Sequence, residues 1–143
     1  MNTLRNIWTL CLLVLCGNVF AQVRADRVNV FTTDSSLRVE LVASSDRAYT
    51  SGLTASITSC ADGSLLWKGE LGKLSLSRSA EGQVCSYEID GLSPELWSPV
   101  SPVLYDLEIS GRGFNCGKRI GFRRFEMKDG NFYLNGKPIS LRG

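Results

Sequence analysis

The sequence predicts an all-β protein built as an antiparallel sandwich, and three observations lead to this fold class. Short runs of residues alternate between apolar and polar along most of the chain, which is the period of a half-buried strand. Glycine is frequent, with 14 among 143 residues, as the turns between many short strands require. No window of eleven residues carries an apolar stripe of helical period. The length suits one domain with a short appendage.

The first 21 residues predict a secretory signal peptide that precedes the fold. Arg5 supplies a positive start, residues 7–16 are a ten-residue apolar run, and residues 19–21 place small side chains at the −3 and −1 cleavage positions. A membrane span needs about 20 apolar residues, so we expect none after cleavage. We therefore expect an exported, periplasmic or extracellular protein. The alternative is a lipoprotein anchored at Cys16, although the large Leu15 fits poorly before that cysteine.

The first predicted strands alternate clearly. Residues 27–31 and 37–42 place an apolar side chain at every second position, so that Leu37, Val39 and Leu41 share one face. Residues 54–60 alternate as well, and residues 64–67 return after the tight-turn pair Asp62-Gly63. This spacing predicts a hairpin.

Three further strands complete the predicted domain. Residues 71–76 are the weakest, residues 83–89 alternate again, and residues 102–109 are the clearest. Six or seven short strands with turns every 8–12 residues fit an immunoglobulin-like sandwich of about 100 residues. We expect residues 22–126 to form it. On one face the clearest strand places Val103, Tyr105, Leu107 and Ile109.

A C-terminal β-hairpin tail follows the predicted sandwich. Asp129-Gly130 and Asn135-Gly136 are both type I′ turn pairs, so two tight reversals and three short strands are expected. Strands this short are marginal alone in water. They leave Phe132, Leu134 and Ile139 exposed, and we expect a covering partner to dock on these three side chains.

Composition excludes several classes of function. Lys+Arg 16 against Asp+Glu 14 gives a net charge of only +2, too small to attract nucleic acid or an anionic membrane. The chain has no histidine, which removes histidine triads and histidine metal sites. Cys60, Cys85 and Cys116 remain after signal cleavage. One disulfide with one free thiol and three buried thiols both stay open, and the second is favoured.

Two longer patterns lie in the last third of the chain. Residues 121–143 are GFRRFEMKDGNFYLNGKPISLRG, and residues 96–107 contain LWSP followed by P-x-L-Y-x-L. Both patterns, in this order, resemble glycoside hydrolase family 2. In that family a G-F-R-x-x-E strand ends an immunoglobulin-like domain, and a D-G-x-F-x-L-N-G-K-P hairpin with L-R-G opens the catalytic (β/α)8 barrel. Residues 24–95 match the family only as sandwich strands of suitable length.

The resemblance implies a parent enzyme of the β-galactosidase, β-glucuronidase or β-mannosidase kind that cleaves O-glycosyl bonds with retention. Residues 127–143 would then be the start of the barrel, with the rest of the barrel and the family's N-terminal jelly roll missing. The family's two catalytic glutamates lie in the barrel, and no Asn-Glu pair occurs here. We therefore expect no catalytic, cofactor-binding or metal-binding residue, no cofactor, and contact with carbohydrate only through the parent enzyme. A truncated chain, a split chain and a genuine short form stay open.

Two functions follow from these observations. The first is a non-catalytic module of such a hydrolase, inactive alone, on whose Phe132, Leu134 and Ile139 the barrel docks. The second is an autonomous exported sandwich that binds glycan or protein, provided that several aromatic side chains share one exposed face. The candidates for sugar stacking are Trp67, Tyr87, Trp97, Tyr105 and Tyr133.

Some residues in the last third have a structural and a functional interpretation. We expect Trp97 to pack at a strand entry rather than to stack on a sugar, and Asn135-Gly136 to form a turn rather than a site. A basic cluster predicts a solvated or interdomain strand, where Arg123 would pair with a barrel carboxylate under the resemblance. The cluster consists of Lys118, Arg119, Arg123 and Arg124.

Overall fold

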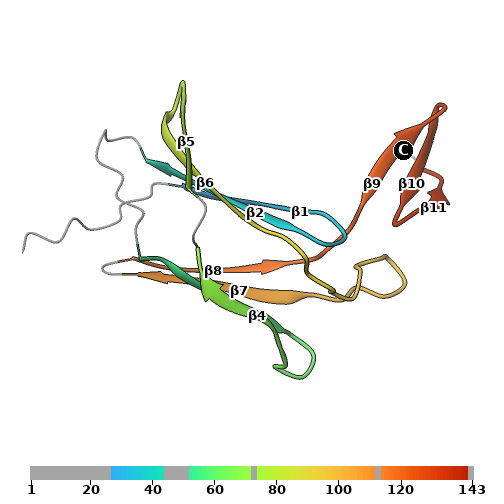
Figure 1. Ribbon diagram of the computed structural model, residues 1–143. Coiled ribbons are helices and arrows are strands. Elements are labelled where there is room, and N and C mark those ends of the chain that lie inside the picture. The colour runs from blue at the N-terminus through green and yellow to red at the C-terminus, as the bar shows by residue number, and fades with distance from the viewer. Residues whose placement is uncertain (1–26, 44–51, 72–73, 112–113, 142–143) are drawn as a thin grey trace, which may run out of the picture.

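The computed structural model describes residues 27–43, 52–71, 74–111 and 114–141, and the predicted signal peptide lies outside them. Two four-stranded sheets face each other, and a three-stranded sheet projects beyond one end of this sandwich (Figure 1). The described ranges contain no helix, and therefore none that is long and apolar enough to cross a membrane.

The sandwich has the strand order of an immunoglobulin-like domain. One sheet runs β1-β2-β6-β5 and the other runs β4-β3-β7-β8, and every pairing is antiparallel. These orders match the ABED sheet and the CFG sheet with one added edge strand. The predicted fold class is confirmed. The strands are β1 (Arg27–Thr32), β2 (Leu37–Ala43), β3 (Thr54–Ser59), β4 (Leu65–Glu70), β5 (Leu74–Ser79), β6 (Gly82–Ile89), β7 (Tyr105–Gly111) and β8 (Phe114–Ile120).

The core lies between the two sheets and follows the alternation of the sequence. Leu37, Val39 and Leu41 are buried on one face of β2, while Arg38 on the other face is exposed. The register places Val39 opposite the buried Tyr87 of β6. Burial of each large aliphatic side chain contributes about 1.5–3 kcal/mol, so this shared face drives the two sheets together.

Tyr105 forms a tyrosine corner at the start of β7. Its ring is 6% exposed and meets the ring of Phe122 edge-on, with centroids 5.4 Å apart. Its hydroxyl accepts a hydrogen bond of 2.9 Å from the backbone amide of Glu95. This contact, which is characteristic of immunoglobulin-like domains, fixes the segment that crosses from one sheet to the other.

Three strand predictions were incomplete, and two of them concern edge strands. The strand predicted over residues 102–109 is β7, which begins only at Tyr105, so Val103 lies in the preceding loop. The predicted strand over residues 71–76 begins later, because Leu71 bonds to Leu53 and only residues from Leu74 to Ser79 pair with β6. The strand β8 was indicated only by the basic cluster and without bounds, because Asn115, Gly117, Lys118 and Arg119 are exposed and leave no clear alternation. Pairing with β7 makes it a strand.

The tail forms a three-stranded antiparallel sheet in the order β11-β10-β9. Its strands are β9 (Phe125–Lys128), β10 (Asn131–Leu134) and β11 (Lys137–Ile139). The φ angles are 50° and 74° at Asp129-Gly130, and 53° and 78° at Asn135-Gly136. Positive φ at both central residues is the requirement of a type I′ turn, so both predicted reversals are confirmed.

The tyrosine corner gives a test of the sandwich. We expect Tyr105→Phe to lower the free energy of unfolding by about 1–2 kcal/mol, because the hydroxyl's hydrogen bond to the Glu95 amide is lost while the ring packing stays. Urea unfolding followed by fluorescence measures this. Tyr133→Phe is the matched control and should change stability by less than about 0.5 kcal/mol. Equal effects of the two variants would contradict the corner's role.

Candidate functional site

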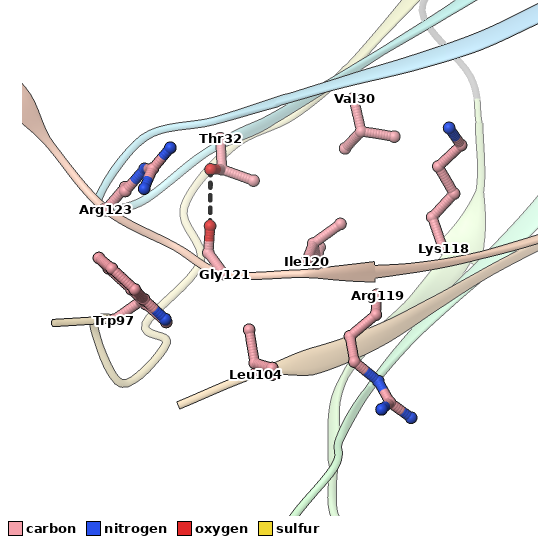
Figure 2. Close-up of a pocket in the computed structure, with 9 residues that line it drawn as sticks. All are labelled: Val30, Thr32, Trp97, Leu104, Lys118, Arg119, Ile120, Gly121 and Arg123. Carbon is pink, nitrogen blue, oxygen red and sulfur yellow. Dashed lines mark hydrogen bonds between the residues drawn. The ribbon is translucent and has the colours of Figure 1, made fainter. Parts of the chain in front are cut away.

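A hollow of about 370 Å³ lies between β1, β8 and the loop that precedes β7 (Figure 2). Its apolar lining comes from Val30, Leu104 and Ile120, and the indole of Trp97 adds an aromatic side. Three cations also line it, namely Lys118, Arg119 and Arg123. The nine lining residues include no carboxyl group, so the hollow combines positive charge with an apolar surface and suits an anionic group.

The three cations that line the hollow differ in whether they pair with a carboxylate. The Nε atom of Arg119 donates to Oδ1 of Asp106 at 3.0 Å, and this bond holds the pKa of Asp106 below its ordinary value. Within the described residues, neither Lys118 nor Arg123 has a carboxylate partner. Asp106 is thus kept as an anion, which makes it unsuited to donate a proton near neutral pH.

Cys60 lies beside this ion pair and is not an activated nucleophile. Partial loss of hydration and the hydrogen bond to Asp106 raise the pKa of the Cys60 thiol above its ordinary value. A raised pKa reduces the thiolate, which is the reactive form. Of the three cysteines, only Cys85 is fully buried, while Cys116 is half-buried and Cys60 is exposed. The favoured interpretation of three buried thiols is therefore wrong for Cys60.

Trp97 packs against the end of β8 rather than standing free. Its amide donates to the carbonyl of Phe122 at 2.7 Å, and a Cβ added at Gly121 would lie 3.2 Å from the Cβ of Trp97. The guanidinium of Arg123 lies over the indole, 5.3 Å from its centroid. These contacts agree with the prediction that Trp97 packs at a strand entry. The ring is half-buried and lines the hollow.

Two of the five aromatic residues that were candidates for sugar stacking are buried. Tyr87 is 1% exposed and Tyr105 is 6% exposed, so both belong to the core. The expectation that Tyr105 faces inward is confirmed. The remaining candidates lie on different elements, with Trp67 in β4, Trp97 in the loop before β7 and Tyr133 in β10.

Asn135 makes three hydrogen bonds where the three-stranded sheet meets the sandwich. Two of them extend the β9–β10 pairing at Arg124, and one reaches Trp97 on the sandwich side. Its backbone amide donates to the carbonyl of Arg124 at 2.7 Å, and its Oδ1 accepts from the amide of Arg124 at 2.9 Å. Its Nδ2 donates to the carbonyl of Trp97 at 2.9 Å. We call this meeting point of residues 97, 121–124 and 135 the junction. Sequence analysis recognised Asn135 as a turn former and missed its second role.

Charged side chains add to the junction at its surface. The guanidinium of Arg124 bonds to Asp34, in the turn between β1 and β2, at 3.0 Å. It also lies 3.4 Å from the carboxylate of Glu126. Both ion pairs are partly exposed, so each stabilises the fold by at most about 1 kcal/mol and mainly orients the Arg124 side chain.

The three-stranded sheet has one apolar face. The register places Phe125 opposite Leu134, and Phe132 opposite both Met127 and Ile139, so these five apolar residues share the face. Lys137 pairs with Leu134 and lies on the same face. Leu134 is only 8% exposed, whereas Phe125 is 53% and Met127 is 71% exposed. The expectation that the three docking residues are exposed is therefore wrong for Leu134, which is buried, while Phe132 and Ile139 are half-buried. Sequence analysis missed Phe125 and Met127, whose pairing depends on the register.

The described residues hold no group of three or more histidine, cysteine or acidic residues that could bind a metal ion. The absence of catalytic and cofactor-binding residues stays a prediction. What the described residues do offer is a cationic hollow, a rigid junction and an uncovered apolar face.

Comparison with known proteins finds partial relatives among glycosidases. Over 60 residues the chain is 35% identical to a β-galactosidase of Staphylococcus xylosus, which is 42% of this chain and 6% of that enzyme. Over 57 residues it is 46% identical to a putative β-glucuronidase of Formosa agariphila, which is 36% of this chain and 7% of that protein. Part of the chain is therefore homologous to these glycosidases, as the resemblance predicts. No family model matches it.

The fold has counterparts among solved structures. The model resembles Bacteroides uniformis β-glucuronidase 3 with a TM-score of 0.51 at 24% identity, over 84% of this chain and 15% of that one. This likeness concerns the fold. The chain thus spans 6–7% of the length of the curated relatives named above.

The Cys60 environment gives a test with a defined sign. Asp106→Asn removes a carboxylate that raises the thiol's pKa, so we expect Cys60 to react about two- to fivefold faster with iodoacetamide at pH 8. Peptide mass spectrometry across a pH series would record the rates, with Cys116 in the same sample as the reference. An unchanged pH profile at Cys60 would show that Asp106 does not control it.

Proposed function

We propose that this chain is the non-catalytic immunoglobulin-like module of a family 2 glycoside hydrolase, and that it positions the enzyme's (β/α)8 barrel. The parent enzyme would hydrolyse O-glycosyl bonds with retention. The observation that carries the proposal is the three-stranded sheet. It is joined to the sandwich at the junction, and its apolar face presents Phe125 and Met127, which are 53% and 71% exposed.

The chemistry of the described acidic residues supports a non-catalytic role. Retaining hydrolysis needs two carboxyl groups about 5–5.5 Å apart, one protonated and one ionised. Asp106, beside the hollow, is held ionised by Arg119, and Asp34 and Glu126 are paired with Arg124. These carboxylates stabilise local structure, and the module contributes to the reaction by position.

The occupant that we propose for the apolar face is the barrel. Residues 127–143 resemble the hairpin that opens the barrel in this family, so the following chain would continue directly from the sheet. Phe125, Met127 and Phe132 supply apolar area. The rings of Phe125 and Phe132 stack with their centroids 5.6 Å apart, so this part of the surface is formed before docking. Arg123, without a carboxylate partner here, suits an acidic residue of the barrel.

We also propose that the protein is exported. The sequence pattern of residues 1–21 supports cleavage of a signal peptide and a periplasmic or extracellular location. The second candidate function, an autonomous binding module, loses support because Tyr87 and Tyr105 are buried.

A hydrolysis assay tests the non-catalytic role. We expect the purified chain to release no chromophore from aryl β-galactosides or aryl β-glucuronides above the rate of buffer. Turnover that persists through purification and disappears when a described glutamate is changed to glutamine would overturn the proposal.

A chimera tests the positioning role. Residues 27–141 would replace the segment of Bacteroides uniformis β-glucuronidase 3 that has the same fold, a match over 84% of this chain, and we expect the chimera to keep activity. Within it, Met127→Glu should lower activity and reduce the Tm by several degrees, because a charge would be buried against the barrel. The matched control is Lys128→Glu on the opposite face, which should be neutral. Equal effects of both variants would contradict docking on the apolar face.

A further inference from the structure

We propose that Asn135 is a deamidation site which the folded junction protects, and that loss of its amide releases the three-stranded sheet from the sandwich. This inference concerns bonds within the chain and stands whether or not the chain serves a glycosidase. Asn135-Gly136 is the only Asn-Gly pair in the sequence. Glycine has no Cβ, so its backbone nitrogen reaches the preceding side chain with little steric hindrance.

The reaction needs only water as co-reactant. The backbone nitrogen of Gly136 loses its proton and attacks Cγ of Asn135. The bond from Cγ to Nδ2 breaks, Nδ2 takes up a proton, and ammonia leaves as a five-membered succinimide closes. Water then opens this ring at one of its two carbonyls and gives aspartate or isoaspartate. Asparagine is thermolabile for this reason.

Hydrogen bonds in the junction hold both the oxygen and the nitrogen of the Asn135 side-chain amide. Oδ1 accepts from the Arg124 amide at 2.9 Å, and Nδ2 donates to the Trp97 carbonyl at 2.9 Å. Trp97 belongs to the sandwich side, whereas Arg124 directly precedes β9 and extends the β9–β10 pairing. The side chain can therefore rotate toward Gly136 only when the three-stranded sheet parts from Trp97 and β10 parts from Arg124. We therefore infer that the reaction proceeds from the undocked state and reports how often that state forms.

Deamidation would in turn disfavour docking. A carboxylate at position 135 can still accept from the Arg124 amide, but it has no N–H for the Trp97 carbonyl and sets an oxygen against it. Isoaspartate also adds a methylene to the backbone of a two-residue turn with φ angles of 53° and 78°. That turn fixes the register of β10 and β11, so the added methylene would weaken the pairing of these two strands.

The second type I′ turn provides an internal control. Asp129-Gly130 has nearly the same φ angles as Asn135-Gly136, and the Asp129 side chain makes no hydrogen bond among the described residues. The variant Asp129→Asn therefore places two Asn-Gly pairs in one sheet, one held by the junction and one not. Peptide mass spectrometry can follow both positions in the same sample at pH 8.

We expect Asn135 to deamidate at least about tenfold more slowly than position 129 in the folded variant, a ratio that two ordinary hydrogen bonds can supply. In 8 M urea the two rates should agree within about twofold, since the local sequences are then all that differs. Equal rates in the folded protein, whether fast or slow, would overturn the protective role of the junction.

The consequence of deamidation is tested with Asn135→Asp. Hydrogen exchange should become about tenfold faster for amides in β9, β10 and β11, while those of β2 and β6 keep their rates. The Asp129→Asn variant is the matched control and should leave both groups unchanged. Unaltered exchange in Asn135→Asp would show that the amide does not hold the sheet.

Discussion

The architecture depends on which groups hydrogen-bond to the backbone where β8 ends and the chain leaves the sandwich. Polar backbone groups that leave a sheet need other partners. At residues 121–124 these partners come from three distant segments. Thr32 donates to the Gly121 carbonyl at 2.8 Å (Figure 2), and the Trp97 amide donates to the Phe122 carbonyl. Asn135 bonds to both backbone groups of Arg124.

This constraint explains why the sequence patterns that carry the family resemblance occur where they do. The patterns LWSP, GFR and NGKP lie at residues 96–99, 121–123 and 135–138, yet Trp97, residues 121–124 and Asn135 meet in the junction. Gly121 has no side chain because Trp97 occupies the adjacent space. The tyrosine corner lies next to it, since Phe122 packs edge-on against Tyr105. The shared motifs thus maintain one angle between the sandwich and the sheet beyond it.

The site's charges and apolar surface fit a role in assembly. The hollow gathers cations and no carboxylate, Phe125 and Met127 are exposed on the apolar face of the three-stranded sheet, and Asp106 is paired with Arg119. Part of the chain is homologous to glycosidases. A small sheet held rigidly by hydrogen bonds can orient a large neighbour, because little conformational entropy remains to be lost on docking.

The sequence alone determined the features that depend on local periods and local dihedral angles. Alternation marked β2 and β6, and the pairs Asp129-Gly130 and Asn135-Gly136 defined both turns, because side-chain period and positive φ are properties of neighbouring residues. Tertiary structure decided the edge strand β8, the start of β5, the partners of Asn135 and the exposure of Met127. Each of these depends on a pairing or contact between distant segments, and such contacts leave no periodic pattern in the residues that make them.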